Sequence, residues 1–250
     1  MIKTEDIVTG EGNLFEFFKI RFEECLGSYP VFRDRKLAVC VDIGANIGCF
    51  SIFGSPFFEN IYALEPVEQN FNIMNKIISH LGKNNIKTYK IGVSDKNSKN
   101  IKIYNQHGRS GDCCIYKSDS KNGQKEYQSE TIEVVDFETL FSMLNVDFID
   151  YLKIDCEGSE YSFLYNQDLS RVGTIAIEIH GPPDGCNISQ SEFILFLCKN
   201  FESAFTKEYI FFGLNRNGPG MDKTPEAINK DFELCYKSIF GKSHTQNDVE

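Results

Sequence analysis

Residues 38–51, AVCVDIGANIGCFS, decide the fold. The stretch begins as a short, almost wholly apolar run that ends on Asp42 and continues into glycine. A strand that is apolar on both faces is typical of a buried parallel sheet, so the stretch predicts a central strand that leads into a ligand-binding loop. In that loop, Gly44 permits a tight turn and a close backbone approach. We expect Asn46 to cap the following helix and Gly48 to let that helix lie against the sheet.

The chemistry of this loop points away from a dinucleotide. Its pattern is D-x-G-x-x-x-G, whereas the dinucleotide fingerprint G-x-G-x-x-G brings backbone N–H groups against a pyrophosphate. The carboxylate of Asp42 at the strand end repels phosphate and suits a cationic or hydroxyl-rich ligand. S-adenosylmethionine fits this description, because it carries a sulfonium, an ammonium and no phosphate.

A second apolar strand, in residues 60–66, ends on Glu65. A carboxylate about twenty residues after such a loop is placed to accept hydrogen bonds from both hydroxyls of a ribose. Taken alone, Glu65 is equally consistent with an ordinary solvated loop acid. Because it follows the Asp42 loop, we interpret Glu65 as a ribose ligand.

Composition limits the partners and the compartment. The 250 residues, 41% hydrophobic and 25% charged, predict one soluble domain over residues 1–250. The formal net charge of −10 and the lack of a basic run argue against nucleic acid as a partner. Nine cysteines, with no C-x-x-C pair and no secretory signal, predict reduced thiols in the cytoplasm and no zinc motif. The longest apolar runs are too short for a membrane span.

Strand and helix patterns alternate along the chain. Apolar residues at helical spacing predict helices at 13–26, 68–81, 137–144, 189–199 and 224–240. Apolar or alternating runs predict further strands at 86–93, 131–135, 148–154, 174–181, 201–206 and 209–214, the last two forming a hairpin. This succession predicts an α/β fold with a parallel sheet. We expect an N-terminal cap helix at 13–26, a core at 38–214, and a C-terminal helix and tail at 215–250.

Residues 96–125 interrupt this alternation and predict an insertion at the strand ends. The segment is rich in Lys, Asn, Ser and Gly, with short strand-like pieces at 101–104 and 113–117. One interpretation is a lid over the substrate, with polar side chains pointing inward from His107, Arg109 and Ser110. An equally good interpretation is a solvated hairpin with no role in function.

The second informative stretch is YLKIDCEGSE, in which strand alternation puts Lys153 and Asp155 on one face. A lysine inside a core strand needs a charged partner. We therefore predict contacts from Lys153 to some of Asp155, Glu157, Glu160 and Glu178. The main role of this set is expected to be a salt-bridge lattice that orients loops.

The strand at 174–181 ends with Glu178 and His180 on one face. Open α/β sheets bind their ligands at the carboxyl ends of their strands. Two ionisable groups at such an end indicate a functional site, whereas the simpler interpretation of His180 is a hydrogen bond to a neighbouring loop.

Together these motifs resemble the FkbM family of S-adenosylmethionine-dependent methyltransferases. The resemblance rests on five pieces in the same order: VDIGANIG at 41–48, LEP at 64–66 with Asn70, GVSD at 92–95, LKIDCEGSE at 152–160, and IEIH at 177–180. It implies a Rossmann-like class I methyltransferase fold: a mostly parallel seven-stranded sheet with the last strand antiparallel and helices on both faces. It also implies O-methylation of a hydroxyl on a sugar, glycolipid, glycan or natural product.

The resemblance further implies which residues bind S-adenosylmethionine. The methionine part would contact Asp42 and the loop backbone, and the ribose would contact Glu65. The adenine would lie beside Ser94 and Asp95, and the methionine amine would lie beside Asp155. In order, these residues are Asp42, Gly44, Ala45, Asn46, Gly48, Glu65, Ser94, Asp95 and Asp155.

For catalysis we expect His180 to remove the acceptor's proton, with Glu178 as its orienting or substrate-binding neighbour. We expect no metal, because magnesium prefers oxygen ligands and no further His or Cys stands at ligand spacing near His180. The base would then be a neutral imidazole with an ordinary pKa of about 6.5.

Two other classes of function stay open from the sequence. One is an NAD(P)-dependent oxidoreductase on a Rossmann sheet, which the missing G-x-G-x-x-G and the presence of Asp42 disfavour. The other is a module that binds S-adenosylmethionine without catalysis.

Overall fold

The computed structural model describes residues 8–9, 12–13, 25, 28–32, 35–105, 113–114, 128–207 and 210–215. Almost all of the predicted cap helix at 13–26 lies outside the described residues, as do the predicted helix at 224–240 and the side chains of His107, Arg109 and Ser110.

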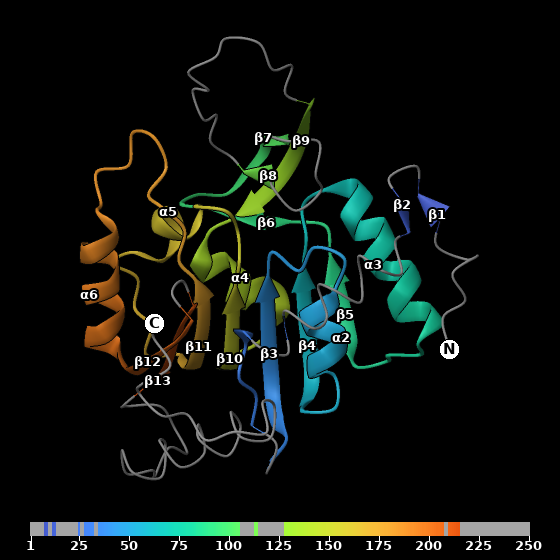
Figure 1. Cartoon of the computed structure of the whole chain (residues 1–250), viewed down its shortest axis with the longest axis horizontal. Coiled ribbons are helices and arrows are strands. Elements are labelled where there is room, and N and C mark those ends of the chain that lie inside the picture. Colours follow the sequence, from blue (N-terminus) through green and yellow to red (C-terminus); the bar gives the residue numbers. More distant parts are fainter. Residues whose placement is uncertain are drawn as a thin grey trace.

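A seven-stranded sheet forms the centre of the molecule (Figure 1). Its strands lie in the order β12-β13-β11-β10-β3-β4-β5. All neighbouring pairs are parallel except those of β13, which runs antiparallel to both β11 and β12. The strand bounds are β3 Leu37–Ile43, β4 Phe58–Leu64, β5 Ile86–Tyr89, β10 Ile149–Ile154, β11 Val172–Glu178, β12 Phe201–Lys207 and β13 Ile210–Asn215. The predicted mostly parallel sheet, its antiparallel last strand and its terminal hairpin are confirmed.

Helices pack on both faces of this sheet, as predicted. They are α2 Cys49–Gly54, α3 Glu68–His80, α4 Phe137–Leu144, α5 Glu160–Leu164 and α6 Gln190–Asn200. Alternate residues of β3 enter different cores: Val41 and Ile43 pack in the core that contains α4, α5 and α6, whereas Cys40 packs in the core that contains α2 and α3. Because both faces are covered, the strand is apolar throughout. Within the described residues, no helix is both long and apolar enough to cross a membrane.

The predicted strand at 86–93 is in fact two strands in two sheets. Its first half is β5, at the edge of the main sheet, and its second half is β6 Gly92–Val93. β6 pairs in parallel with β9 Gln128–Val135, and β9 pairs with β7 Ser98–Asn105, which pairs with β8 Cys113–Cys114. The chain leaves the main sheet here because β9 offers β6 a new partner.

This second, four-stranded sheet lies beyond the carboxyl ends of the main strands (Figure 1). A small apolar cluster of Ile103, Ile132 and Val134 holds it together and packs against Val67. Within the predicted insertion, residues 98–105 and 113–114 are therefore strands of this sheet. A separate two-stranded sheet joins β1 Val8–Thr9 and β2 Gly12–Asn13.

The loop after β3 differs in two details from expectation. Asn46 does not cap α2: its Oδ1 accepts a hydrogen bond from the next residue's N–H, and the residue that precedes the helix is Gly48. A Cβ on Gly48, at φ 85°, would lie 2.9 Å from Cγ of Met74 in α3. Gly48 therefore lets the loop approach α3, not the sheet.

Candidate active site

A buried ion pair lies under the loop that follows β3. Lys153 of β10 is the register partner of Asp42 in β3. Its Nζ lies 3.1 Å from Asp42 Oδ1 and donates to the carbonyl oxygen of Gly44 at 3.0 Å. Ser51 donates to the other oxygen of Asp42 at 2.7 Å. Lys153 thus joins the end of the central strand to the backbone of the glycine loop.

Lys153 is 3% exposed, so the prediction of a buried, paired lysine is confirmed. Burial alone would lower its pKa, but the carboxylates of Asp42 and Asp155 raise that pKa above the ordinary value and keep the lysine protonated. Asp155 lies 3.8 Å away, and Asp42, which was not among the predicted partners, is the closer one.

Asp42 itself does not reach the cavity. Its side chain is fully buried, and the residue is not part of the cavity wall. The reason is the strand register, which aims Asp42 at Lys153 on the same face of the sheet. We therefore correct the predicted role of Asp42 from ligand contact to support of the loop that carries the ligand.

Gly44 is required where the loop crosses the end of β10. Its φ is 76°, and a Cβ built on it would lie 1.8 Å from the carbonyl oxygen of Asp155. The loop is fixed from the other side, because the N–H groups of Gly44 and Ala45 both donate to the carbonyl oxygen of Leu64. A side chain at position 44 would push apart the two loops that border the cavity.

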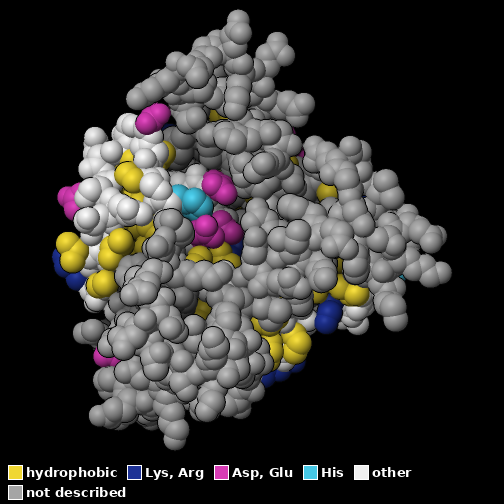
Figure 2. Space-filling view, viewed as in Figure 1, with side chains coloured by type: hydrophobic (Ala, Val, Ile, Leu, Met, Phe, Trp, Pro, Cys, Tyr) yellow, Lys and Arg dark blue, Asp and Glu magenta, His cyan; other side chains and the backbone are white. Residues whose placement is uncertain are grey.

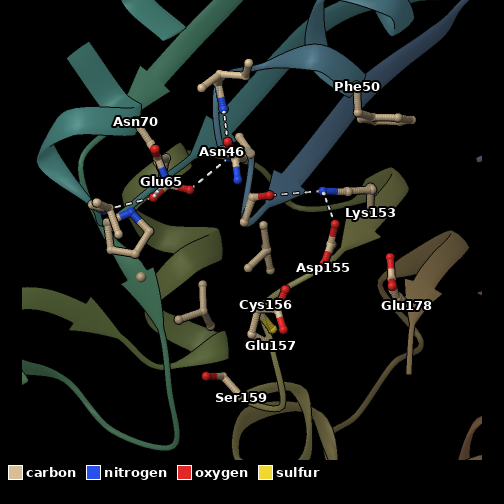
Figure 3. Close-up of a pocket in the computed structure, with 18 of the residues that line it drawn as sticks. Asn46, Phe50, Glu65, Asn70, Lys153, Asp155, Cys156, Glu157, Ser159 and Glu178 are labelled. Carbon is tan, nitrogen blue, oxygen red and sulfur yellow. Dashed lines mark hydrogen bonds and ion pairs between the residues drawn. The ribbon is translucent and has the colours of Figure 1, made fainter. Parts of the chain in front are cut away.

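Glu65 lies at the end of β4 and lines the cavity (Figure 3). Its two carboxylate oxygens accept hydrogen bonds from the backbone N–H groups of Asn46 and Val67, both at 2.9 Å, and from the Asn70 amide at 3.4 Å. Burial raises its pKa to about 7, although these hydrogen bonds act in the opposite direction. A carboxylate has about four acceptor sites, so Glu65 keeps capacity for a ligand hydroxyl.

His180 follows β11 and lies among four carboxylates. Its Nδ1 is 3.3 Å from Oε1 of the fully buried Glu160, which also accepts the backbone N–H of His180 at 2.9 Å. Its Nε2 faces Glu157 at 3.5 Å, Glu178 at 3.8 Å and Asp155 at 4.0 Å. Figure 2 shows histidine and acidic side chains side by side on the open face of the molecule.

These carboxylates change the charge expected on His180. Burial lowers the imidazole pKa, but the hydrogen bond and charge of Glu160, with the charges of Asp155 and Glu157, outweigh it and raise the pKa to about 9. His180 is therefore protonated at pH 7, and the prediction of a neutral imidazole with an ordinary pKa is wrong. His180 is also not part of the cavity wall, whereas Glu178 is.

Tyr29 is a site residue that sequence reasoning missed. Its hydroxyl lies 3.3 Å from both Asp155 Oδ2 and Glu178 Oε2, and its ring is 5.4 Å from Lys153 Nζ. Burial, followed by the charges of those two acids, raises the pKa of Tyr29 well above its usual value, so the phenol remains a donor. Burial and the charge of Asp155 likewise raise the pKa of Glu178. Tyr29 belongs to no motif, so only its position in space reveals it.

The cavity between these groups has a volume of about 380 Å³. Of the predicted cofactor residues, the structure places five on its wall: Gly44, Ala45, Asn46, Glu65 and Asp155. Gly48 packs on α3 instead, and Asp42 lies beneath the loop. In Figure 3, Glu65 lies on one side of the cavity, with Asp155 and Glu178 on the other.

Ser94 and Asp95 are not part of the wall. The Ser94 N–H donates to the carbonyl oxygen of Val135 in β9, so Ser94 is tied to the second sheet, and its hydroxyl donates to the exposed Asp95 at 3.1 Å. The wall is formed here by the residues just before them and by two isoleucines of the second sheet: Ile91, Gly92, Val93, Ile103 and Ile132. The switch of β6 into the second sheet explains the difference.

The cavity wall therefore offers three kinds of surface. An apolar patch from β6 and the second sheet suits a flat base, the buried Glu65 suits ribose hydroxyls, and the Gly44 loop beside Asp155 suits a chain that carries an amine. These surfaces fit S-adenosylmethionine.

The strand order of the main sheet, with its antiparallel β13, is that of the Rossmann-like class I methyltransferases. The sequence matches the methyltransferase FkbM domain over residues 42–204, well over half of the chain. The chain belongs to the FkbM methyltransferase family. No curated protein sequence matches it.

Several solved structures are similar to this chain. The methyltransferase FkbM from Methylobacillus flagellatus is 15% identical, with a TM-score of 0.43. The match covers 75% of this chain and 47% of the M. flagellatus chain, so this chain spans about half the length of that protein. TrmK from M. capricolum, solved with S-adenosylhomocysteine, is 13% identical over 79% of this chain and 68% of its own, with a TM-score of 0.41. An rRNA methylase from Streptococcus thermophilus is 12% identical over 84% of this chain and 100% of its own, with a TM-score of 0.43.

Proposed function

We propose that this methyltransferase transfers its methyl group to a hydroxyl of a sugar, glycan or natural-product acceptor. The observation that carries the proposal is the acidic end of the cavity, where the wall includes Asp155, Glu157 and Glu178. Carboxylates accept hydrogen bonds from hydroxyls and repel phosphate, so this wall suits a hydroxyl-rich acceptor without phosphate. The net charge of −10 supports the same choice over a nucleic acid.

Bound S-adenosylmethionine supplies a methyl group on a positively charged sulfur, which leaves as a neutral sulfide when an acceptor oxygen takes the methyl. The protein then has two tasks: to hold the acceptor oxygen in line and to receive its proton. We assign the second task to Glu178. Its carboxylate lies on the cavity wall, whereas His180 is not part of that wall and both of its ring nitrogens face carboxylates.

Tyr29 and Asp155 position the proposed base. The Tyr29 hydroxyl lies 3.3 Å from Glu178 Oε2, whereas Oε1 lies 3.8 Å from His180 Nε2, too far for a hydrogen bond, and can receive a proton. The same hydroxyl lies 3.3 Å from Asp155 Oδ2, so one phenol ties together the ends of two neighbouring strands. We expect Tyr29→Phe to lower turnover by loosening this arrangement, with less effect than Glu178→Gln.

The test is methyl transfer from isotopically labelled S-adenosylmethionine to a panel of sugars, glycans and polyhydroxylated natural products, with RNA and amines in the same panel. We expect label on hydroxyl oxygen only. Glu178→Gln should lower the turnover by about 10²- to 10⁴-fold with S-adenosylhomocysteine affinity unchanged, which is the range for loss of a general base. Glu59→Gln, at an exposed site on β4, is the matched control. Label on RNA or on amine nitrogen would reject the hydroxyl assignment.

A further inference from the structure

The carboxylates around His180 leave a neutral imidazole at this position with too few hydrogens to donate. Its Nδ1 faces Glu160 at 3.3 Å, so in the neutral ring Nδ1 carries the hydrogen and donates it to that carboxylate. The lone pair of Nε2 then points toward carboxylate oxygens of Glu157 and Asp155, 3.5 and 4.0 Å away. Acceptors that face one another in this way require a cation between them, which is either the proton of the imidazolium in the metal-free protein or a metal ion that replaces this proton.

The spacing of these atoms matches a metal better than a direct hydrogen bond. Hydrogen bonds between nitrogen and a carboxylate are about 2.7 to 2.9 Å long, shorter than both separations at Nε2. Two ligand atoms that each lie about 2.1 Å from a cation are about 3.0 to 3.4 Å apart, depending on the angle between them. One oxygen each of Asp155 and Glu157 and one ring nitrogen of His180 all lie within 4.8 Å of one another, so small side-chain movements bring all three to ligand distance.

We propose that Asp155, Glu157 and His180 form a binding site for a divalent first-row transition metal, such as manganese or zinc. Carboxylate oxygens with one imidazole suit these ions, whereas magnesium prefers an all-oxygen set. Asp155 and Glu157 also line the cavity, so an ion held by these three residues has open positions toward an acceptor oxygen. This proposal replaces the sequence-based expectation of no metal, which rested on the preference of magnesium for oxygen ligands and on the lack of a further His or Cys at ligand spacing near His180.

Glu160 has the environment of a residue that orients a metal-binding histidine. Its carboxylate is fully buried and accepts the backbone N–H groups of Gly158 and His180, both at 2.9 Å, in addition to facing Nδ1. Metal-bound histidines usually donate their second ring N–H to such a carboxylate, which fixes the ring and keeps the other nitrogen directed at the metal. Glu160 is therefore a positioning residue and not a ligand.

Lys153 does not occupy this site. Its Nζ is bound by Asp42 at 3.1 Å and by the Gly44 carbonyl at 3.0 Å, and it approaches Asp155 through Oδ2 at 3.8 Å. The oxygen of Asp155 that faces His180 is Oδ1. The two oxygens of Asp155 therefore face different partners, one toward the lysine and the other toward the proposed ion.

The test is binding of Mn²⁺ to the chelator-treated full-length protein, measured from the free-ion electron paramagnetic resonance signal, with Zn²⁺ and Mg²⁺ as competitors. We expect one saturable site from which Zn²⁺ displaces Mn²⁺ and Mg²⁺ does so poorly. His180→Gln and Glu157→Gln should each weaken binding at least tenfold, and Glu160→Gln should weaken it by a similar factor through the ring orientation. His80→Gln, on α3, and Glu59→Gln, on β4, are the matched controls and should bind Mn²⁺ as the unmodified protein does.

S-adenosylhomocysteine binding and circular dichroism, recorded on every variant, show that the proteins are folded and competent without reference to any acceptor. Absence of saturable Mn²⁺ and Zn²⁺ binding in protein that still binds S-adenosylhomocysteine would overturn the proposal. Binding that survives in both His180→Gln and Glu157→Gln would overturn it as well. Neither result would bear on hydroxyl methylation.

Discussion

Replacing Lys153 by methionine should destabilise the fold strongly. The substitution keeps a side chain of similar length in β10, but it leaves Asp42, which is fully buried, without its cation. Removal of one partner of a buried ion pair costs about 3 to 5 kcal/mol, because the remaining charge is uncompensated. The Gly44 carbonyl also loses a donor. For a domain whose free energy of unfolding is about 5 to 15 kcal/mol, this loss is about a fifth of the total or more.

Urea denaturation followed by circular dichroism measures the effect, provided that the slope of the transition is unchanged. Lys90→Met is the matched control, since Lys90 forms an ion pair with Glu68 in which both side chains are substantially exposed, at 40% and 64%. Exposed pairs contribute about 0 to 1 kcal/mol. The double variant Lys153→Met with Asp42→Asn should recover part of the loss, because it removes the orphaned charge. A transition midpoint in Lys153→Met equal to that of the unmodified protein would refute the buried-pair reasoning.

Two further predictions concern the cofactor cavity. Gly44→Ala should abolish S-adenosylhomocysteine binding, because the new Cβ would lie 1.8 Å from the Asp155 carbonyl oxygen. Gly82→Ala is the control and should retain binding, because Gly82 also has a positive φ, 61°, but has nothing within 4 Å of its Cβ position. Equal affinities of the two variants in calorimetry would contradict the role of the loop. The affinity for S-adenosylhomocysteine should rise with pH through about 7, because the pKa of Glu65 is about 7 in the free protein and ribose hydroxyls favour the ionised carboxylate. That rise should be missing in Glu65→Gln, and a flat profile in the unmodified protein would show that Glu65 does not titrate on binding.

The sequence predicted the elements of this fold well because their signals are local. The helix at 137–144 is found with the predicted bounds, since its apolar periodicity and the Asp136 cap agree. The strand at 86–93 was misjudged because its division depends on pairing with β9, about forty residues further on. Local pattern shows that a segment is extended, but the available partner decides which sheet it joins.

The site was predicted in part for the same reason. Alternation placed Lys153 on the correct face, yet only the adjacency of β10 and β3 shows that its partner is Asp42. The protonated state of His180, which follows β11, arises from carboxylates on other segments: Asp155 and Glu157 after the end of β10, and Glu160 at the start of α5. Periodicity within one segment carries no information about such a convergence.

The measurement that tests the central claim most directly is calorimetric titration of S-adenosylhomocysteine into the unmodified protein and Glu65→Ala, with NAD and NADP as competing ligands. We expect S-adenosylhomocysteine to bind at one site and the dinucleotides not to bind. Glu65→Ala should weaken binding by about 1.5 to 3 kcal/mol, the contribution of hydrogen bonds to a charged group. Binding of NAD or NADP in preference to S-adenosylhomocysteine, or an unchanged affinity in Glu65→Ala, would contradict the cofactor site described above.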